Sequence, residues 1–111
     1  IQGEDYLDGP AFNCGANGIV TGLGNVWIEP YIKMYQAAKA RNNSRVNEIQ
    51  KEIDNLYELI QITGGKLIPA IKAAVSLLDR SNKWMKISSQ TLNEQEVEKV
   101  KRIIEILGIL N

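Results

Sequence analysis

Histidine is absent from this chain of 111 residues, and cysteine occurs only once. The sequence therefore lacks the commonest general base near neutral pH and the commonest metal ligand. The single cysteine, Cys14, excludes a disulfide within the chain and argues against a cysteine-based zinc site. No partner base that would make Cys14 a nucleophile is evident. We therefore expect a buried structural thiol that packs as a small apolar side chain.

Net charge is also lacking, because 13 acidic residues balance 13 basic ones. No basic face argues for binding to nucleic acid, and no acidic tail argues for a cationic partner. Nothing at the start of the sequence, at Ile1, resembles a signal peptide, since no basic segment leads into an apolar core. The absence of secretory features and of disulfides favours a cytoplasmic protein.

Charged side chains are missing from the whole run between Gly9 and Ile28. Pro10, three asparagines and several glycines make this run too polar and too broken for a transmembrane helix. Within it, the stretch Asn17–Gly22 has a short β-branched core between turn residues. This pattern predicts a parallel strand that is buried on both faces.

Apolar residues recur at helical spacing in five stretches, so the chain is predicted to be mostly helical. The first helix is weakened by its internal Gly9-Pro10 pair. The residues expected to share one face of each helix are Leu7, Ala11 and Phe12 (between Asp5 and Cys14); Ile28, Tyr31, Ile32, Tyr35 and Ala38; Val46, Ile49, Ile53, Leu56 and Ile60; Leu67, Ile71, Ala74, Val75 and Leu78; and Val97, Val100, Ile104 and Leu107.

Turn and cap residues separate these helices. Thr91 and Glu94 have the spacing of a capping box before the last helix. Prolines fit the first turn of a helix, and glycines its end. The other residues expected to start, break or end helices are Pro30, Asn42-Asn43-Ser44, Gly64-Gly65, Pro69 and Gly108.

One strand and several one-faced helices cannot form a parallel sheet by themselves. Such a sheet needs neighbouring strands, with helices covering both faces. We therefore expect further strands upstream of Ile1 and interpret the chain as the C-terminal, mostly helical piece of a larger α/β protein.

Two glycine-rich segments follow predicted strands, at the ends where β/α proteins place their active sites. Gly3-Glu4-Asp5-Tyr6 follows a strand expected to end near Ile1-Gln2, and Thr21–Asn25 follows the Ile19-Val20 strand. These glycines also have a simpler interpretation as turn residues, and Asp5 as a helix cap. None of the nine lysines lies at a strand end, where a Schiff-base lysine would be held.

The same segments carry a family resemblance. Gly3-x-Asp5, then Gly15-Ala16-Asn17-Gly18-Ile19-Val20-Thr21-Gly22, then Asn25 resemble the last two β/α units of the dihydrodipicolinate synthase and N-acetylneuraminate lyase family. Tyr35-x-Ala37-Ala38-Lys39-Ala40, the helix around Ile49-Gln50, and Gly64-Gly65-Lys66 with Pro69-x-Ile71-Lys72 resemble that family's C-terminal region.

The resemblance implies a C-terminal fragment of a (β/α)8 TIM barrel. Residues 1–40 would hold the end of strand 7, strand 8 and their helices, and residues 41–111 would form a helical extension packed on the barrel. The implied chemistry is that of a class I aldolase, in which a lysine forms a Schiff base with pyruvate. That lysine and the catalytic tyrosine would lie upstream of Ile1, so this piece alone should be inactive. Family members are usually homotetramers without a metal or an organic cofactor.

Three family positions that contact substrate match residues of this chain. Val20 matches the residue whose backbone carbonyl lies beside pyruvate in the synthases. Gly3 and Asp5 match positions that contact the distal part of the substrate in the lyases. Tyr6 and Gly22 stand where the lyases have Glu and Ser, which argues against sialic acid as substrate.

The second substrate stays open between the aldehyde of a diaminopimelate-pathway synthase and that of a 2-keto-3-deoxy sugar acid aldolase. A non-enzymatic helical interaction module is the alternative from another class. It accounts for residues 26–111, but it leaves the charge-free run from Gly9 to Ile28 unexplained.

Overall fold

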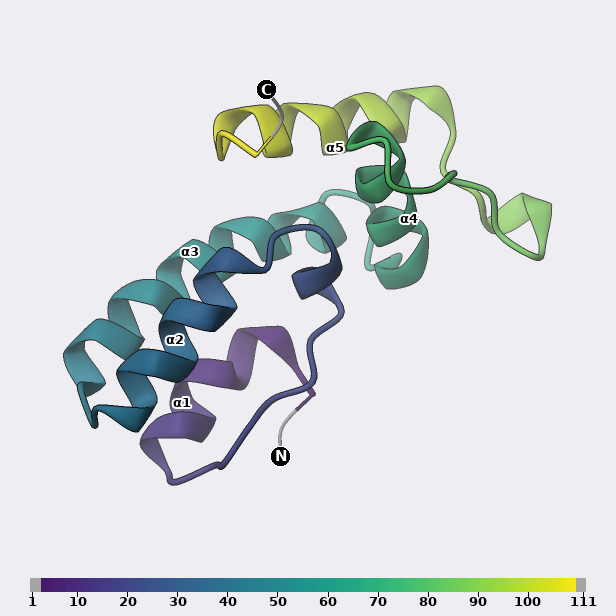
Figure 1. The fold of residues 1–111 in the computed structure, drawn as a ribbon. Coiled ribbons are helices and arrows are strands. Elements are labelled where there is room, and N and C mark those ends of the chain that lie inside the picture. Colours follow the sequence, from purple (N-terminus) through teal and green to yellow (C-terminus); the bar gives the residue numbers. More distant parts are fainter. Residues whose placement is uncertain (1–2, 110–111) are drawn as a thin grey trace. The chain divides into compact units, whose positions relative to one another are not determined.

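The computed structural model describes residues 3–109, and these fold into helices joined by turns and irregular segments (Figure 1). The chain divides into two compact units, residues 1–57 and 58–111, and the division falls within helix α3. The sequence predicted a different boundary, between barrel units at residues 1–40 and a helical extension at residues 41–111. That boundary is defined by packing on a complete barrel, so it stays a prediction. No helix within residues 3–109 is long and apolar enough to cross a membrane.

The first unit contains three short helices, one longer helix and the first part of another. Pro30 lies in the first turn of α2, and Arg41, at a φ of 55°, follows the end of that helix. The side chain of Asn42 then accepts a hydrogen bond from the backbone N–H of Arg45 at 3.1 Å, which caps α3 as expected. The elements are η1 (Asp5–Leu7), α1 (Asp8–Asn13), η2 (Leu23–Asn25), α2 (Glu29–Lys39) and the first part of α3 (Asn43–Gln61).

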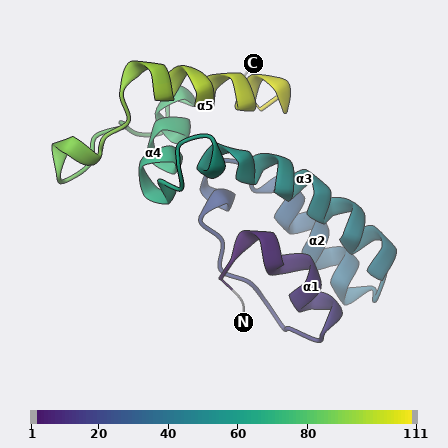
Figure 2. The same ribbon diagram turned by 180° about the vertical axis from the view of Figure 1, so that it is seen from behind.

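Helix α3 has the buried face that its sequence predicts. Val46, Ile49, Ile53 and Leu56 are all fully buried, and Ile60 is 5% exposed. Helix α2 runs beside the first part of α3 in both views (Figures 1 and 2). The periodicity of this stretch was therefore sufficient to find both the helix and its inner face.

Helix α2 differs from its prediction, because it carries apolar side chains on two sides. Tyr31 and Met34 are buried in the first unit, together with Pro30 and Ala37. Ile32 and Tyr35, which were expected to share the buried face with Tyr31, are 50% and 41% exposed. The neighbouring elements of this unit thus cover only one of the two apolar sides.

The predicted helix between Asp5 and Cys14 is present as η1 and α1, but a different face is buried. Asp5, Asp8 and Gly9 are buried, whereas Leu7 is 41% exposed. The reason is a close approach to α3: the N–H of Gly9 donates to the side-chain oxygen of Gln50 at 2.6 Å. The buried thiol predicted for Cys14 is also wrong, because this residue lies at the exposed C-terminal end of α1.

The predicted strand at Asn17–Gly22 is reduced to a single bridge residue, Ile19, and residues 3–109 contain no longer strand. A parallel strand needs a hydrogen-bonded neighbour along its edge. Within the described part of the chain no segment provides that edge over more than one residue. The strand expected to end near Ile1-Gln2 lies outside the described residues.

The second unit is built on the packing of helix α4 (Leu67–Leu77) against helix α5 (Glu94–Ile106), with η3 (Ser88–Gln90) between them. Ala70, Ala73 and Ala74 let the two helices approach closely, and Ile71 is buried beside them as expected. Leu67, predicted on the same face, is 41% exposed. On α5, Val100 and Ile104 are fully buried, in agreement with the predicted stripe.

The ends of these helices follow the glycines. Gly64 and Gly65 have φ angles of 71° and 84°, and the N–H of Gly65 donates to the carbonyl of Ile60 at 2.8 Å to end α3. Gly108, at a φ of 73°, ends α5. All three positions therefore use the left-handed conformation that glycine adopts without strain.

The capping box of α5 lies two residues beyond the predicted one. Asn93 accepts a hydrogen bond from the N–H of Glu96 at 2.9 Å, and its own N–H donates to the Glu96 carboxylate at 3.1 Å. The hydroxyl of Thr91 instead accepts from the N–H of Met85. The prediction of Thr91 with Glu94 was wrong because the sequence offers two boxes of equal spacing, and the helix begins at Glu94.

Candidate functional site

Two of the three residues predicted to face a substrate lie side by side. A Cβ placed on Gly3 would lie 3.8 Å from the backbone carbonyl oxygen of Val20. The side chain of Val20 is 67% exposed, and Gly3 is exposed as well. The loop before η1 and the segment after Ile19 therefore meet at the Val20 carbonyl, as two adjacent strand ends would.

Asp5, the third predicted residue, is 5% exposed and is held by side chains from three other segments. Its Oδ1 accepts hydrogen bonds from the hydroxyl of Thr21 and, at 2.8 Å, from the hydroxyl of Tyr31. Its backbone carbonyl accepts from the side-chain amide of Gln50 at 3.2 Å. The N-cap position of η1 belongs to Glu4, so Asp5 does not act as a helix cap.

Thr21 extends this network along the chain. Its hydroxyl oxygen accepts a hydrogen bond from the N–H of Gly24 at 3.0 Å while the hydroxyl donates to Asp5. A Cβ on Gly24 would lie only 2.6 Å from the methyl carbon of Thr21, so this turn needs glycine. We define Asp5, Thr21, Gly24 and Tyr31 as the Asp5 network.

The network has a single carboxylate and no cation among its members. Burial raises the pKa of Tyr31 above its ordinary range, and the charge of Asp5 adds to the rise. Tyr31 therefore stays protonated and acts as a hydrogen-bond donor. Nearby, Asp8 is 1% exposed; burial first, and then the charge of Asp5, raise its pKa to about 7.

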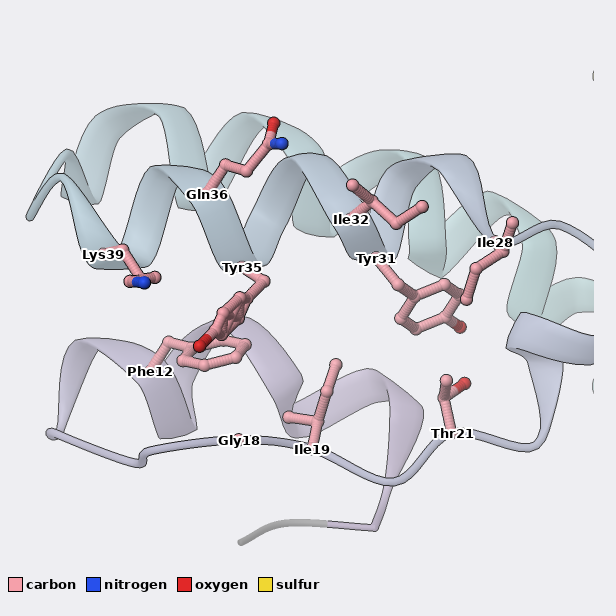
Figure 3. Close-up of a pocket in the computed structure, with 10 residues that line it drawn as sticks. All are labelled: Phe12, Gly18, Ile19, Thr21, Ile28, Tyr31, Ile32, Tyr35, Gln36 and Lys39. Atoms are coloured by element: carbon pink, nitrogen blue, oxygen red, sulfur yellow. The ribbon is translucent and has the colours of Figure 1, made fainter.

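An apolar groove of about 540 Å³ opens beside the network (Figure 3). The segment that carries Gly18, Ile19 and Thr21 lies opposite α2, and the side chain of Ile19 points toward that helix. The ring of Tyr35 meets that of Phe12 edge to face at 6.3 Å. The exposed side of α2, with Ile28 and Ile32, completes the wall.

One lysine, Lys39, lines the groove, at the end away from Thr21 and Tyr31 (Figure 3). Within residues 3–109 no group of three or more His, Cys, Asp or Glu side chains could hold a metal ion. The Asp5 network and the two residues at the Val20 carbonyl contain no lysine. The described residues thus place the Val20 carbonyl oxygen beside Gly3 and hold the Asp5 carboxylate by hydrogen bonds.

Thr21, Gly24 and Tyr31 were not among the predicted site residues. The sequence placed Thr21 in a strand-end segment and Tyr31 on a helix face, and both assignments were compatible with ordinary structural roles. A hydroxyl that finds a partner 16 or 26 residues away leaves no local pattern in the sequence. Only the three-dimensional arrangement reveals that the two hydroxyls share one carboxylate oxygen.

Comparison with known proteins relates the chain to one family over nearly all of its length. The model of the dihydrodipicolinate synthetase family matches residues 1–107. The chain is 29% identical over 108 residues to the 4-hydroxy-tetrahydrodipicolinate synthase of Heliobacterium modesticaldum, covering 97% of this chain and 35% of that protein. It is 28% identical over 110 residues to the synthase of the same name from Methanopyrus kandleri, covering 99% of this chain and 36% of that protein.

A solved structure has a similar fold. The dihydrodipicolinate synthase of Bacteroides thetaiotaomicron matches 94% of this chain with a TM-score of 0.84 and 22% sequence identity, over 36% of its own length. The chain therefore has the mostly helical fold of about a third of such a protein and spans about a third of the length of the relatives it matches.

Proposed function

Because the chain belongs to the dihydrodipicolinate synthetase family, we propose that it is the C-terminal part of a pyruvate-dependent class I aldolase. In this proposal residues 1–40 form the last β/α units of a (β/α)8 barrel, and residues 41–111 form a helical extension packed on it. The Schiff-base lysine and the catalytic tyrosine come from the preceding part of the barrel. The chain contributes one wall of the active site, at Gly3, Asp5 and Val20.

The observation that carries the proposal is the meeting of two segments at the Val20 carbonyl. Gly3 lies against that carbonyl, and Asp5 is bonded to the residue that follows it. Val20 as a residue is 67% exposed and its carbonyl oxygen is flanked by Gly3, and this carbonyl is the group that the resemblance aligns with bound pyruvate. The adjacency of Gly3 and Val20 is what neighbouring strand ends of a barrel require.

The apolar groove supports a larger assembly. Ile28, at the N-cap of α2, and Ile32 and Tyr35 on the helix are each more than 40% exposed and line the groove. Ile19 has one bridge contact where a strand would have a ladder. In the proposed barrel, the first strand and its neighbours cover this groove and pair with the Ile19 segment. The remaining N-terminal part of the barrel is thus the first partner of this chain.

The proposed reaction is the condensation of pyruvate with an aldehyde, as the family resemblance implies, and the similar proteins named as synthases support it. Cleavage of a 2-keto-3-deoxy sugar acid is the alternative within the family. Tyr6 and Gly22 stand where the lyases have the residues that recognise the sugar chain, which argues against sialic acid. They do not identify the aldehyde that takes its place, so both reactions remain open. A helical interaction module explains neither the family match nor the contact at Val20. We further propose a cytoplasmic homotetramer that needs no metal or organic cofactor.

The test is reduction of the Schiff base in the full-length protein. Incubation with pyruvate and borohydride should add one reduced pyruvate to one lysine, detected as a mass increase of the intact protein. The isolated 111 residues serve as the control and should remain unmodified. A full-length protein that gains no mass, while a known class I aldolase treated in parallel does, would contradict the proposal.

A further inference from the structure

Two side chains from different segments converge on one oxygen atom of a third, Asp5. The hydroxyls of Thr21 and Tyr31 both donate to Oδ1 of Asp5. Asp5 and Tyr31 are 5% and 4% exposed, so the bond between them is buried, and the bond from Thr21 is partly buried. In Figure 3 the Tyr31 hydroxyl and the Thr21 side chain point toward each other at one end of the groove. A buried, charge-assisted network of this kind holds its members more firmly than a surface hydrogen bond does.

The network fixes the backbone on the C-terminal side of Val20. The Val20 carbonyl and the Thr21 N–H belong to the same planar peptide group, so the position of Thr21 restricts the direction of that carbonyl. Thr21 is held twice, by its bond to Asp5 and by the bond that it accepts from Gly24. The next turn is closed by the Asn25 side chain, which donates to the Gly22 carbonyl at 2.9 Å.

The other side of the same carbonyl is held through Asp5 as well. Gly3, which lies against the Val20 oxygen, precedes Asp5 by two residues. Gln50 of α3 bonds to the backbone carbonyl of Asp5 and thereby ties this turn to the core of the unit. Asp5 therefore connects the two segments that flank the Val20 carbonyl.

We infer that Thr21 and Tyr31 are positioning residues, which act through Asp5 to aim the Val20 carbonyl at the pyruvate site. The inference rests on the proposed function, because the carbonyl needs a fixed direction only if it faces a ligand. A preoriented acceptor does not have to be reorganised when the substrate binds, so it lowers the pyruvate concentration that the enzyme requires. Tyr31 contributes through the same Asp5 oxygen as Thr21.

The experiment measures borohydride trapping in the full-length protein as a function of pyruvate concentration. Thr21→Val removes the hydroxyl at nearly constant volume, Thr21→Ser keeps it, and Tyr31→Phe removes only the phenolic oxygen. Tyr35→Phe is the matched control, since its hydroxyl on the same helix takes no part in the Asp5 network. Thermal melting of each variant separates a loss of folding from a loss of positioning.

Thr21→Val is expected to raise the half-saturating pyruvate concentration about tenfold, equivalent to about 1.4 kcal/mol. Thr21→Ser and Tyr35→Phe should leave it unchanged. Tyr31→Phe should raise it, and the double variant should raise it by less than the product of the single effects, because both hydroxyls act through one oxygen.

Three results would overturn the inference, and only the last of them also contradicts the proposed function. If the wild-type protein traps pyruvate but Thr21→Val shows the same half-saturation, the Asp5 network has no positioning role and the proposed function stands. The same holds if Thr21→Val lowers only the melting temperature. If the wild-type protein traps no pyruvate, the proposed function fails and the inference fails with it.

Discussion

Asp8 is the least exposed charged side chain that the structure describes, and neither of its carboxylate oxygens has a hydrogen-bond partner among the described residues. Its pKa is raised from 3.8 to about 7, chiefly because burial disfavours the charged form and further because Asp5 lies nearby. The folded chain therefore binds this proton more tightly than the unfolded chain does.

This raised pKa predicts a pH dependence of stability. The favourable contribution of protonated Asp8 is present below about pH 4 and is lost as the pH rises from about 4 to about 7. Asp8→Asn, which cannot ionise, should remove that loss. At pH 8 the variant should exceed the wild type in unfolding free energy by up to about 4 kcal/mol. Urea-unfolding midpoints between pH 4 and pH 8 provide the measurement, and parallel profiles for the two proteins would contradict the assignment.

Gly9 shows how closely α1 approaches α3. A Cβ at this position would lie 2.9 Å from Oε1 and 3.1 Å from Cβ of Gln50. Gly9→Ala should therefore destabilise the protein by about 1–3 kcal/mol, although alanine favours helices. In a double-mutant cycle, Gly9→Ala should cost clearly less once Gln50→Ala has removed the Oε1 and Cγ contacts, with only the contact to Cβ at 3.1 Å left. An equal effect of Gly9→Ala in both backgrounds would show that the Gln50 contact is not the cause.

At the scale of elements, the sequence predicted the positions of helices better than it predicted which of their faces are covered. The stripe from Val46 to Ile60 identified α3 and its buried face, because 3.6-residue periodicity reports burial directly. The same reasoning failed for α2, which has two apolar sides, and for Asn17–Gly22, whose expected strand partners are not among the described residues. Periodicity identifies apolar faces, but it does not say which of them a neighbouring element covers.

The start of α5 gives a test at this scale. Asn93→Ala removes the observed capping box and should reduce the unfolding free energy by about 1 kcal/mol. Glu94→Ala, which would break the box expected from sequence, should change it by only a few tenths of a kcal/mol. Both are read from urea-unfolding midpoints. A larger effect at Glu94 than at Asn93 would contradict the observed cap.

For the whole molecule, only some residues of the candidate site could be predicted from the sequence. The family resemblance named Gly3, Asp5 and Val20, and the fold brings these segments together. It did not name Thr21 or Tyr31, because their partners depend on how distant segments meet. The open groove along α2 likewise becomes visible only in three dimensions, and in the proposed barrel it is covered by segments outside these 111 residues.

This chain and the preceding part of the barrel are proposed to form one active site together. The most direct test is to locate the lysine that pyruvate modifies. The full-length protein is reduced with borohydride in the presence of pyruvate, digested, and mapped by peptide mass spectrometry. The account predicts a single modified lysine in a peptide that precedes residue 1, with all nine lysines of this chain unmodified. A modification on any of these nine lysines, or on none in the whole protein, would contradict it.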